Sequence, residues 1–306
     1  MTVSPRIVFM GSPAFAVPSL RLLAGTYRTV GVVTQPDRPS GRGRTLVPPP
    51  VKEAALELGL PLIQPEKLRQ PEAMQQLREW SPDVIIVAAF GQILRQEVLD
   101  LPPFGCVNVH ASLLPRWRGA APINAAILAG DAETGITIMK MDAGVDTGPM
   151  LARRAIPIAA DDTAGSLFVK LAALGGDLLL ETLPGYLSGE IRPHSQPDEG
   201  ATYAPMLKKE DGLLDFTRPA DELARRVRAF DPWPGAYFQF NGQPLKVHAA
   251  HRAEGRGETG RRLIVQGMPA VAASDGLLIL DEVQPAGKKS MPGKAFLSGA
   301  RDWSET

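Results

Sequence analysis

The sequence predicts an α/β fold in which a doubly wound, Rossmann-like domain precedes a small OB-like β-barrel domain. Apolar runs alternate with helix-like segments in the first half of the chain, as in βαβ units built on a parallel sheet. Beyond residue 207, short strands follow one another between tight-turn pairs, which is typical of a small antiparallel barrel. With 306 residues, 44% of them hydrophobic, the chain is long enough for two such cores.

The first domain is expected to span residues 1–189. The run at 83–90, DVIIVAAF, is continuously apolar, which indicates a parallel strand covered on both faces. The remaining expected strands of this domain cover residues 6–10, 29–35, 60–64, 106–110, 134–141 and 149–158. The expected helices cover residues 11–25, 50–59, 71–80, 121–130 and 164–189.

Residues 190–207 are rich in proline and polar side chains and lack periodicity, so we interpret them as a linker. The second domain then spans residues 208–306 and begins with a helix at 219–230. Asn241-Gly242 predicts a two-residue hairpin, because a type I′ turn needs positive φ at both central residues. Asp275-Gly276 is a second candidate turn. The expected strands of this domain cover residues 236–240, 244–251, 262–265, 270–273 and 277–283.

Composition narrows the possible function classes. Thirty-three basic residues balance 33 acidic ones, which argues against a globally basic nucleic-acid binder and leaves local patches open. The single cysteine, Cys106, excludes a disulfide framework, and the four histidines lack metal-ligand spacing, so no metal is expected. No apolar run approaches membrane-spanning length and no signal segment is evident, so a cytoplasmic protein without membrane contact is expected.

The turn after the first strand, FMGSPAF, resembles a dinucleotide-binding turn without its GxGxxG pattern. Pro13 also removes one N–H donor. We therefore interpret this turn as structural and expect no nicotinamide cofactor.

Three further segments are candidate sites. Asn108 and His110 alternate with Val109 at a strand end and so share one face, although a structural histidine would fit the same pattern. Asp142 and Asp146 lie in a glycine-bearing loop between two apolar strands, which is either a site or a solvated surface loop. Residues 35–52 form an unusually long loop with four basic and one acidic side chain, which is either a disordered insertion or an anion-binding arm.

Residues 108–151, NVHASLLPRWRGAAPINAAILAGDAETGITIMKMDAGVDTGPML, resemble the formyltransferases that use 10-formyltetrahydrofolate. The loop TQPDRPSGRGRTLVPPPVK (34–52), RAFDPWPGAYF (228–238) and VQPAGKK (283–289) resemble the members that act on methionyl initiator tRNA. The resemblance covers nearly the whole chain. It implies a formyltransferase catalytic domain at 1–189 and an OB-like tRNA-binding domain at 208–306.

The resemblance also implies roles for individual residues. It places catalysis on Asn108, His110 and Asp146, and contact with the tRNA on the loop residue Arg42. Lys208 and Lys209, at the start of the second domain, form a basic cluster that could add to the tRNA-binding surface. The folate-binding residues that it implies are Phe90, Gly91, Ser112, Leu113, Leu114, Pro115 and Asp142.

The implied reaction is attack of the methionyl amine on the formyl carbon, with Asn108 and His110 donating to the developing oxyanion and Asp146 taking up a proton. No covalent enzyme intermediate is needed, so Cys106 is expected to be an inert buried residue. The partners are folate and the tRNA, and a monomer is expected. Two alternatives remain: a formyltransferase acting on an amino sugar nucleotide, and a non-catalytic RNA-binding OB protein.

Overall fold

A computed structural model describes residues 4–40 and 45–304. The described residues form two compact units. The first unit draws on Met1–Pro122, Glu133–Pro157 and Phe168–Ala204, and the second on Ile123–Ala132, Ile158–Leu167 and Pro205–Thr306. Residues 190–204 of the expected linker thus lie in the first unit.

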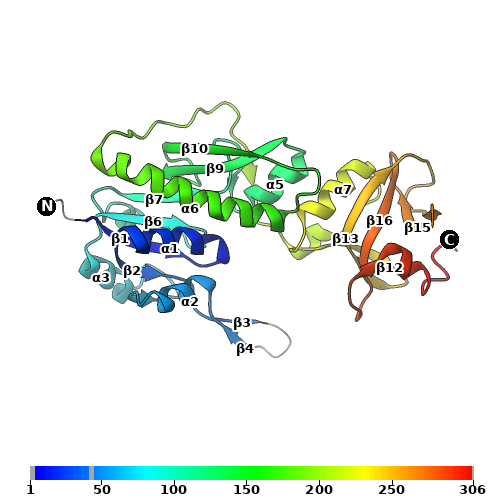
Figure 1. The fold of residues 1–306 in the computed structure, drawn as a ribbon, viewed down its shortest axis with the longest axis horizontal. Coiled ribbons are helices and arrows are strands. Elements are labelled where there is room, and N and C mark those ends of the chain that lie inside the picture. Colours follow the sequence, from blue (N-terminus) through cyan, green and yellow to red (C-terminus); the bar gives the residue numbers. More distant parts are fainter. Residues whose placement is uncertain (1–3, 41–44, 305–306) are drawn as a thin grey trace. The chain divides into compact units, whose positions relative to one another are not determined.

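The first unit is built on a seven-stranded sheet with the order β10-β9-β7-β6-β1-β2-β5 (Figure 1). Its strands are β1 (Arg6–Gly11), β2 (Arg28–Val33), β5 (Leu62–Ile63), β6 (Val84–Ala88), β7 (Cys106–His110), β9 (Glu133–Lys140) and β10 (Met150–Pro157). Strands β7, β6, β1, β2 and β5 are parallel, which confirms the Rossmann-like arrangement. The remaining two strands differ: β9 is antiparallel to β7, and β10 is antiparallel to β9. The loop between β9 and β10 is too short for the crossover that a parallel pair would need.

Helices cover both faces of this sheet. Side chains of α3 (Pro71–Trp80) pack with Val8 and Met10 of β1, which share a face. Helices α1 (Val17–Thr26) and α6 (Ala164–Ser188) lie over the other face (Figure 1). Gly11 explains the turn after β1, because a Cβ there would lie 2.7 Å from the Cβ of Ala16 and 2.9 Å from the carbonyl oxygen of Ala88. The glycine therefore permits close packing of the turn, as the structural interpretation requires.

Shorter elements complete the first unit. The long loop after β2 contains a hairpin that the sequence did not predict, in which β3 (Arg38–Ser40) pairs with β4 (Thr45–Val47). Another small pair joins distant segments, since β8 (Arg118–Gly119) is parallel to β11 (Tyr203–Ala204). The remaining helices before α6 are a 3₁₀ turn (Ala14–Ala16), α2 (Pro50–Glu57), α4 (Gln96–Leu99) and α5 (Pro122–Ala129), of which α5 continues into the second unit.

The second unit contains a separate antiparallel sheet with the order β12-β13-β16-β15-β14, to which β17 adds beside β16. Its strands are β12 (Ala236–Phe240), β13 (Gln243–Ala253), β14 (Arg262–Val265), β15 (Met268–Ala272), β16 (Leu277–Gln284) and β17 (Met291–Pro292). Its helices after residue 204 are a 3₁₀ turn (Lys209–Gly212), α7 (Ala220–Ala229) and α8 (Gly293–Leu297). Asn241 and Gly242 have φ values of 51° and 71°, as the predicted type I′ turn requires.

The core of the second unit combines aliphatic side chains with a group of aromatic rings. Trp303, only 1% exposed, packs edge-on against Phe238 and Phe296 at centroid distances of 6.3 and 5.5 Å. These contacts bring the end of the chain back against β12 and α8. No helix among the described residues is both long and apolar enough to cross a membrane.

Candidate active site

Strand β7 aims Asn108 and His110 away from α6. A Cβ on Gly175 of α6 would lie 2.7 Å from Val109 Cγ1, so Val109 faces that helix and its two neighbours face the opposite side. Asn108 is 9% exposed and His110 is 6% exposed. The two polar side chains therefore lie together on one face of the sheet, as the alternation predicted.

Asp146 meets both of them. Its Oδ1 lies 3.5 Å from Asn108 Nδ2 and 3.6 Å from His110 Nδ1. Its Oδ2 accepts a hydrogen bond of 2.8 Å from the backbone N–H of Gly119. The Asp146 side chain is 17% exposed, so the carboxylate is open to a substrate while it is surrounded by donors. The three residues predicted to be catalytic thus lie together.

The ring of His110 is oriented by a carbonyl group. Its Nε2 lies 2.9 Å from the oxygen of Trp117, which can only accept, so Nε2 carries a hydrogen. In a neutral ring Nδ1 would then turn a lone pair toward Asp146, whereas in an imidazolium it presents an N–H. Both ring nitrogens of His110 face groups of the protein, so donation to a substrate oxygen would have to be shared.

The predicted folate-binding segment Ser112–Pro115 follows β7, and hydrogen bonds fix its backbone. Ser112 is fully buried, and its hydroxyl donates to the carbonyl oxygen of Arg116 at 2.7 Å. Thr137 of β9 donates to the Ser112 carbonyl at 2.7 Å and accepts from Leu114 N at 3.1 Å. These bonds fix the backbone of the segment next to His110. Leu113 belongs to the same turn and is half-buried.

Phe90 and Gly91 follow β6, the neighbour of β7. Phe90 is buried, and its carbonyl oxygen accepts hydrogen bonds from Ser12 Oγ at 3.3 Å and from Gln35 Nε2 at 3.1 Å. Gly91 has φ 79°, a left-handed conformation that suits glycine. The backbone at this predicted folate position is therefore fixed from the ends of β1 and β2.

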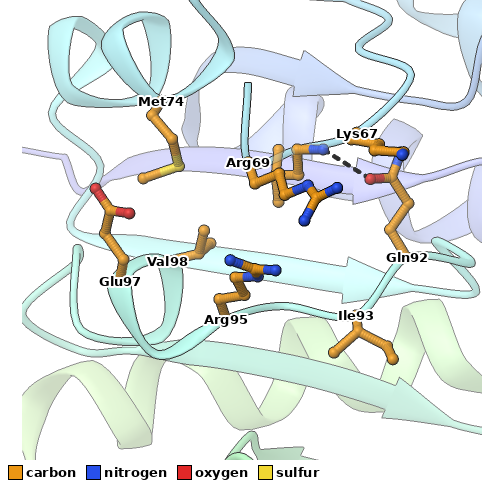
Figure 2. Close-up of a pocket in the computed structure, with 9 residues that line it drawn as sticks. Lys67, Arg69, Met74, Gln92, Ile93, Arg95, Glu97 and Val98 are labelled. Carbon is orange, nitrogen blue, oxygen red and sulfur yellow. Dashed lines mark hydrogen bonds between the residues drawn. The ribbon is translucent and has the colours of Figure 1, made fainter. Parts of the chain in front are cut away.

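A cavity of about 270 Å³ opens immediately after Gly91 (Figure 2). Leu68, Met74 and Val98 are among its apolar lining residues, and Figure 2 shows the guanidinium groups of Arg69 and Arg95 pointing into the same space. Gln92 Oε1 accepts from Leu68 N at 2.8 Å and ties the two sides together. The complete lining is Lys67, Leu68, Arg69, Met74, Gln92, Ile93, Arg95, Glu97 and Val98. The arrangement is an electropositive hollow that begins at the residue after Gly91, a predicted folate-binding position.

The other predicted residues are less closely tied to this cluster. Asp142 Oδ1 accepts from Gly144 N at 3.0 Å and from Thr147 Oγ1 at 2.7 Å, so its exposed carboxylate shapes the loop that carries Asp146. Arg42 lies outside the described residues. Lys208 and Lys209 are exposed and belong to the second unit.

Sequence reasoning missed several groups that hold this site. The Gly119 N–H and the Trp117 carbonyl are backbone atoms, and backbone contacts leave no mark in side-chain patterns. Gln196 lies in the expected linker, and its amide donates to the carbonyl oxygens of Asp146 and Gly148, each at 2.8 Å. A lone glutamine in a polar, aperiodic stretch gives no signal in a single sequence.

Comparisons with known proteins identify relatives of the chain. The family profile described as "Formyl transferase" matches residues 6–183, and "Formyl transferase, C-terminal domain" matches residues 206–301. A relative named methionyl-tRNA formyltransferase, from Myxococcus xanthus, is 54% identical over 297 residues, 96% of this chain and 95% of its own length. A relative of the same name from Halorhodospira halophila is 53% identical over 303 residues, 98% of this chain and 97% of its own.

Solved structures share the fold at lower identity. WlaRD, a sugar 3N-formyl transferase, has a TM-score of 0.68 at 17% identity and covers 94% of this chain and 99% of its own. HypX from Aquifex aeolicus, solved with tetrahydrofolic acid, has a TM-score of 0.62 at 18% identity and covers 97% of this chain and 47% of its own. These two likenesses concern the fold alone.

Proposed function

The chain belongs to the formyl transferase family, and from this premise we propose that it transfers the formyl group of 10-formyltetrahydrofolate to the amino group of methionyl-tRNA. The product is N-formylmethionyl-tRNA, which serves translation initiation. The observation that carries the chemistry is the position of the Asp146 carboxylate. It lies beside the side chains of Asn108 and His110 at the end of β7. The near-complete coverage by relatives of that activity supports the acceptor.

Catalysis starts when the amine nitrogen attacks the formyl carbon. The π electrons of the formyl C=O move onto oxygen, and the tetrahedral intermediate then expels N10 of the folate, which takes up a proton. Asn108 donates its amide N–H to the developing oxyanion. Its contact with Asp146, at 3.5 Å, is at the long limit of hydrogen bonding, so little is lost when the amide turns to the substrate.

Asp146 and His110 act on the proton of the amine and on the charge of the intermediate, respectively. The attacking amine must lose a proton, and the Asp146 carboxylate accepts it directly or through water. When its ring carries both protons, His110 beside Asp146 contributes positive charge toward the same oxyanion. Because the Nε2–H of His110 is bound to the Trp117 carbonyl, we assign Asn108 as the direct donor and His110 as an electrostatic and shared one.

The formyl donor is proposed to lie along Phe90, Gly91, Asp142 and the segment Ser112–Pro115. Folates end in a glutamate whose carboxylates are negatively charged. The hollow shown in Figure 2 begins at the residue after Gly91 and presents Arg69 and Arg95 beside apolar side chains. We place the glutamate end of the donor there, because paired guanidinium groups bind carboxylates well.

We propose that Arg42, Lys208 and Lys209 contact the tRNA. Basic side chains bind the phosphates of a nucleic acid whatever its base sequence. Arg42 would act at the acceptor end of the initiator tRNA and the lysines along its backbone. A cytoplasmic location and a monomeric state remain predictions.

The alternatives are separated by one assay. The structural likeness to sugar formyl transferases, at 17% identity, shows a shared fold and gives no argument for a sugar acceptor. The protein is incubated with 10-formyltetrahydrofolate and either methionyl initiator tRNA or an amino sugar nucleotide. We expect formylation of the tRNA alone. Formylation of the sugar nucleotide, or binding of tRNA without transfer, would refute the proposal.

A further inference from the structure

A segment of the expected linker, His194–Ala204, runs across the active site of the first unit; we call it the strap. At one end, His194 bridges to Met150 at the start of β10. At the other end, β11 pairs with β8, and Thr202 accepts a hydrogen bond of 2.9 Å from Trp117 N through its hydroxyl. Trp117 in turn presents its carbonyl to His110, so the strap reaches the catalytic histidine through one residue.

Gln196 is the side chain through which the strap reaches Asp146. Its amide nitrogen donates to the carbonyl oxygens of Asp146 and Gly148, each at 2.8 Å. Its amide oxygen accepts from Nε and Nη2 of Arg118, at 3.0 and 2.9 Å. Arg118 is only 7% exposed. Every polar atom of the carboxamide is therefore used, and only an amide has the required donors and acceptor at one end.

The backbone at Asp146 needs such support. Its φ is 51°, a left-handed conformation that is uncommon for a residue other than glycine. Arg118 is followed directly by Gly119, whose N–H binds the Asp146 carboxylate at 2.8 Å. A Cβ on Gly119 would lie 2.7 Å from the carbonyl oxygen of Ala204 in the strap, so only glycine permits this approach. Gln196 thus connects both segments that set the position of the carboxylate.

We propose that Gln196 is a positioning residue for formyl transfer: it bridges the Asp146 loop to Arg118 and so holds the Asp146 carboxylate against Asn108 and His110. The inference rests on the proposed function, which gives Asp146 its catalytic role. Among the described residues, the side chain of Gln196 bonds to Asp146, Gly148 and Arg118 and not to Phe90, Gly91 or the segment Ser112–Pro115. Its removal should therefore slow the chemical step and leave substrate binding unaltered.

The test uses the full chain with two substitutions. Gln196→Glu keeps the shape and the acceptor for Arg118, but it places oxygen against the carbonyls of Asp146 and Gly148. Gln196→Ala removes all four bonds without repulsion. We expect kcat to fall by about 10–100-fold in both, because small displacements of reacting groups have effects of this size. KM for the donor and for methionyl-tRNA should stay at the wild-type value. If Gln196→Glu does not fold, Gln196→Ala decides.

Two controls separate positioning from a merely structural role. Ser195→Ala changes the exposed neighbour on the strap and should keep wild-type kcat. Gln196→Ala is also combined with Asp146→Asn; if Gln196 acts through Asp146, the double variant should be no slower than Asp146→Asn alone.

Three outcomes would overturn the inference: wild-type kcat in the Gln196 variants, losses that add fully in the double variant, or a loss that lies in KM. If Asp146→Asn loses activity while the Gln196 variants keep wild-type kcat, the positioning role of Gln196 is refuted and the catalytic role of Asp146 stands. Wild-type activity in Asp146→Asn would instead refute the catalytic role given to Asp146 in the proposed function.

Discussion

Asp146 is the residue on which the donors of the site converge. The side chains of Asn108 and His110 and the backbone N–H of Gly119 all surround its carboxylate. A carboxylate shared by several donors is strongly oriented, and each donor gives up only part of its bonding when it turns to a substrate. The site is therefore arranged before the substrate binds, which is the condition for electrostatic stabilisation of an oxyanion.

Asn108→Ala and His110→Ala should each lower the single-turnover rate of formyl transfer, the former by about 10²–10³-fold because it removes a direct oxyanion donor. The fold should remain, since both side chains lie at the end of β7 and point away from α6. Rapid-quench measurement of formylmethionyl-tRNA gives the rate, and circular dichroism checks the fold. A folded variant with a near-normal rate would remove that residue from the scheme.

Cys106 lies on the same strand and should take no part in the reaction. Burial raises the pKa of its thiol to about 12, and the thiol donates to the Val98 carbonyl at 3.6 Å. At pH 8 only about one thiol in ten thousand is ionised, so iodoacetamide should label the native protein very slowly. In urea, where the thiol is exposed, labelling should be fast. Equal rates in both states, or lost activity in Cys106→Ala, would contradict this assignment.

Among the elements, the β3–β4 hairpin is pinned at its base. Asp37 accepts from Gln64 Nε2 at 2.8 Å and from Lys52 Nζ at 2.7 Å, and these two partners, Gln64 first, hold the pKa of Asp37 below its ordinary value. A carboxyl with a lowered pKa contributes stability that is present above its unfolded value, 3.8, and is lost as the pH falls through the lower folded value. The pinning is therefore complete at neutral pH.

The β3–β4 hairpin is expected to contribute to binding of the tRNA acceptor and not to binding of the folate donor. Arg42→Leu should lower kcat/KM for methionyl initiator tRNA and reduce discrimination against elongator tRNA, because a cation that binds phosphate is lost. Asp37→Asn should act in the same direction more weakly by loosening the base. The KM for 10-formyltetrahydrofolate should not change in either variant. A parallel loss of donor affinity, or an unchanged preference for the initiator, would refute the assignment.

The hollow between the β5–α3 and β6–α4 connections is expected to bind the glutamate end of the folate donor. Arg69→Gln and Arg95→Gln should each raise the KM for 10-formyltetrahydrofolate, with a larger effect on a donor that carries additional glutamates, because each adds a carboxylate. The KM for methionyl-tRNA should stay constant. Arg28→Gln, at the exposed amino end of β2, is the matched control. Equal KM values for short and long glutamyl donors in all variants would place the tail elsewhere.

On the scale of the whole molecule, the compact units do not follow the chain order. Residues 123–132 and 158–167 group with the C-terminal part. Within that second unit, Asn124 donates to the Ala229 carbonyl at 2.6 Å, Arg228 to the Asp162 carbonyl at 2.8 Å and Arg225 to the Leu128 carbonyl at 3.4 Å. Both segments fall within residues 6–183, which match the first family profile, and yet they belong to the second unit.

A fragment ending at Ala204 should consequently be less stable than the full chain. Three lost hydrogen bonds at roughly 1 kcal/mol each correspond to a drop in Tm of about 6–12 °C in a domain of this size. Thermal unfolding of the fragment and of the full chain measures the difference, and Asn124→Ala in the full chain isolates one bond. An unchanged Tm would support the independent catalytic domain that the sequence pattern predicts at residues 1–189.

The sequence by itself determined the elements whose cause is local. Apolar runs predicted the strands of both main sheets except β17, and Asn241-Gly242 predicted its turn, because periodicity and turn chemistry act over a few neighbouring residues. Alternation in NVH placed Asn108 and His110 on one face, and resemblance to a family supplied Asp146 as their partner. Both sources point to one site at the end of one strand.

Only the tertiary structure decided what holds that site. The pairing of β8 with β11 and the contacts of Gln196 join residues far apart in the chain, and most of them use backbone groups that every residue possesses. A hydrogen bond from Gln196 to the Asp146 carbonyl spans 50 residues and depends on how strands β7, β9 and β10 are placed in the sheet. No short stretch of sequence encodes such a contact, because it exists only once the chain has folded around it.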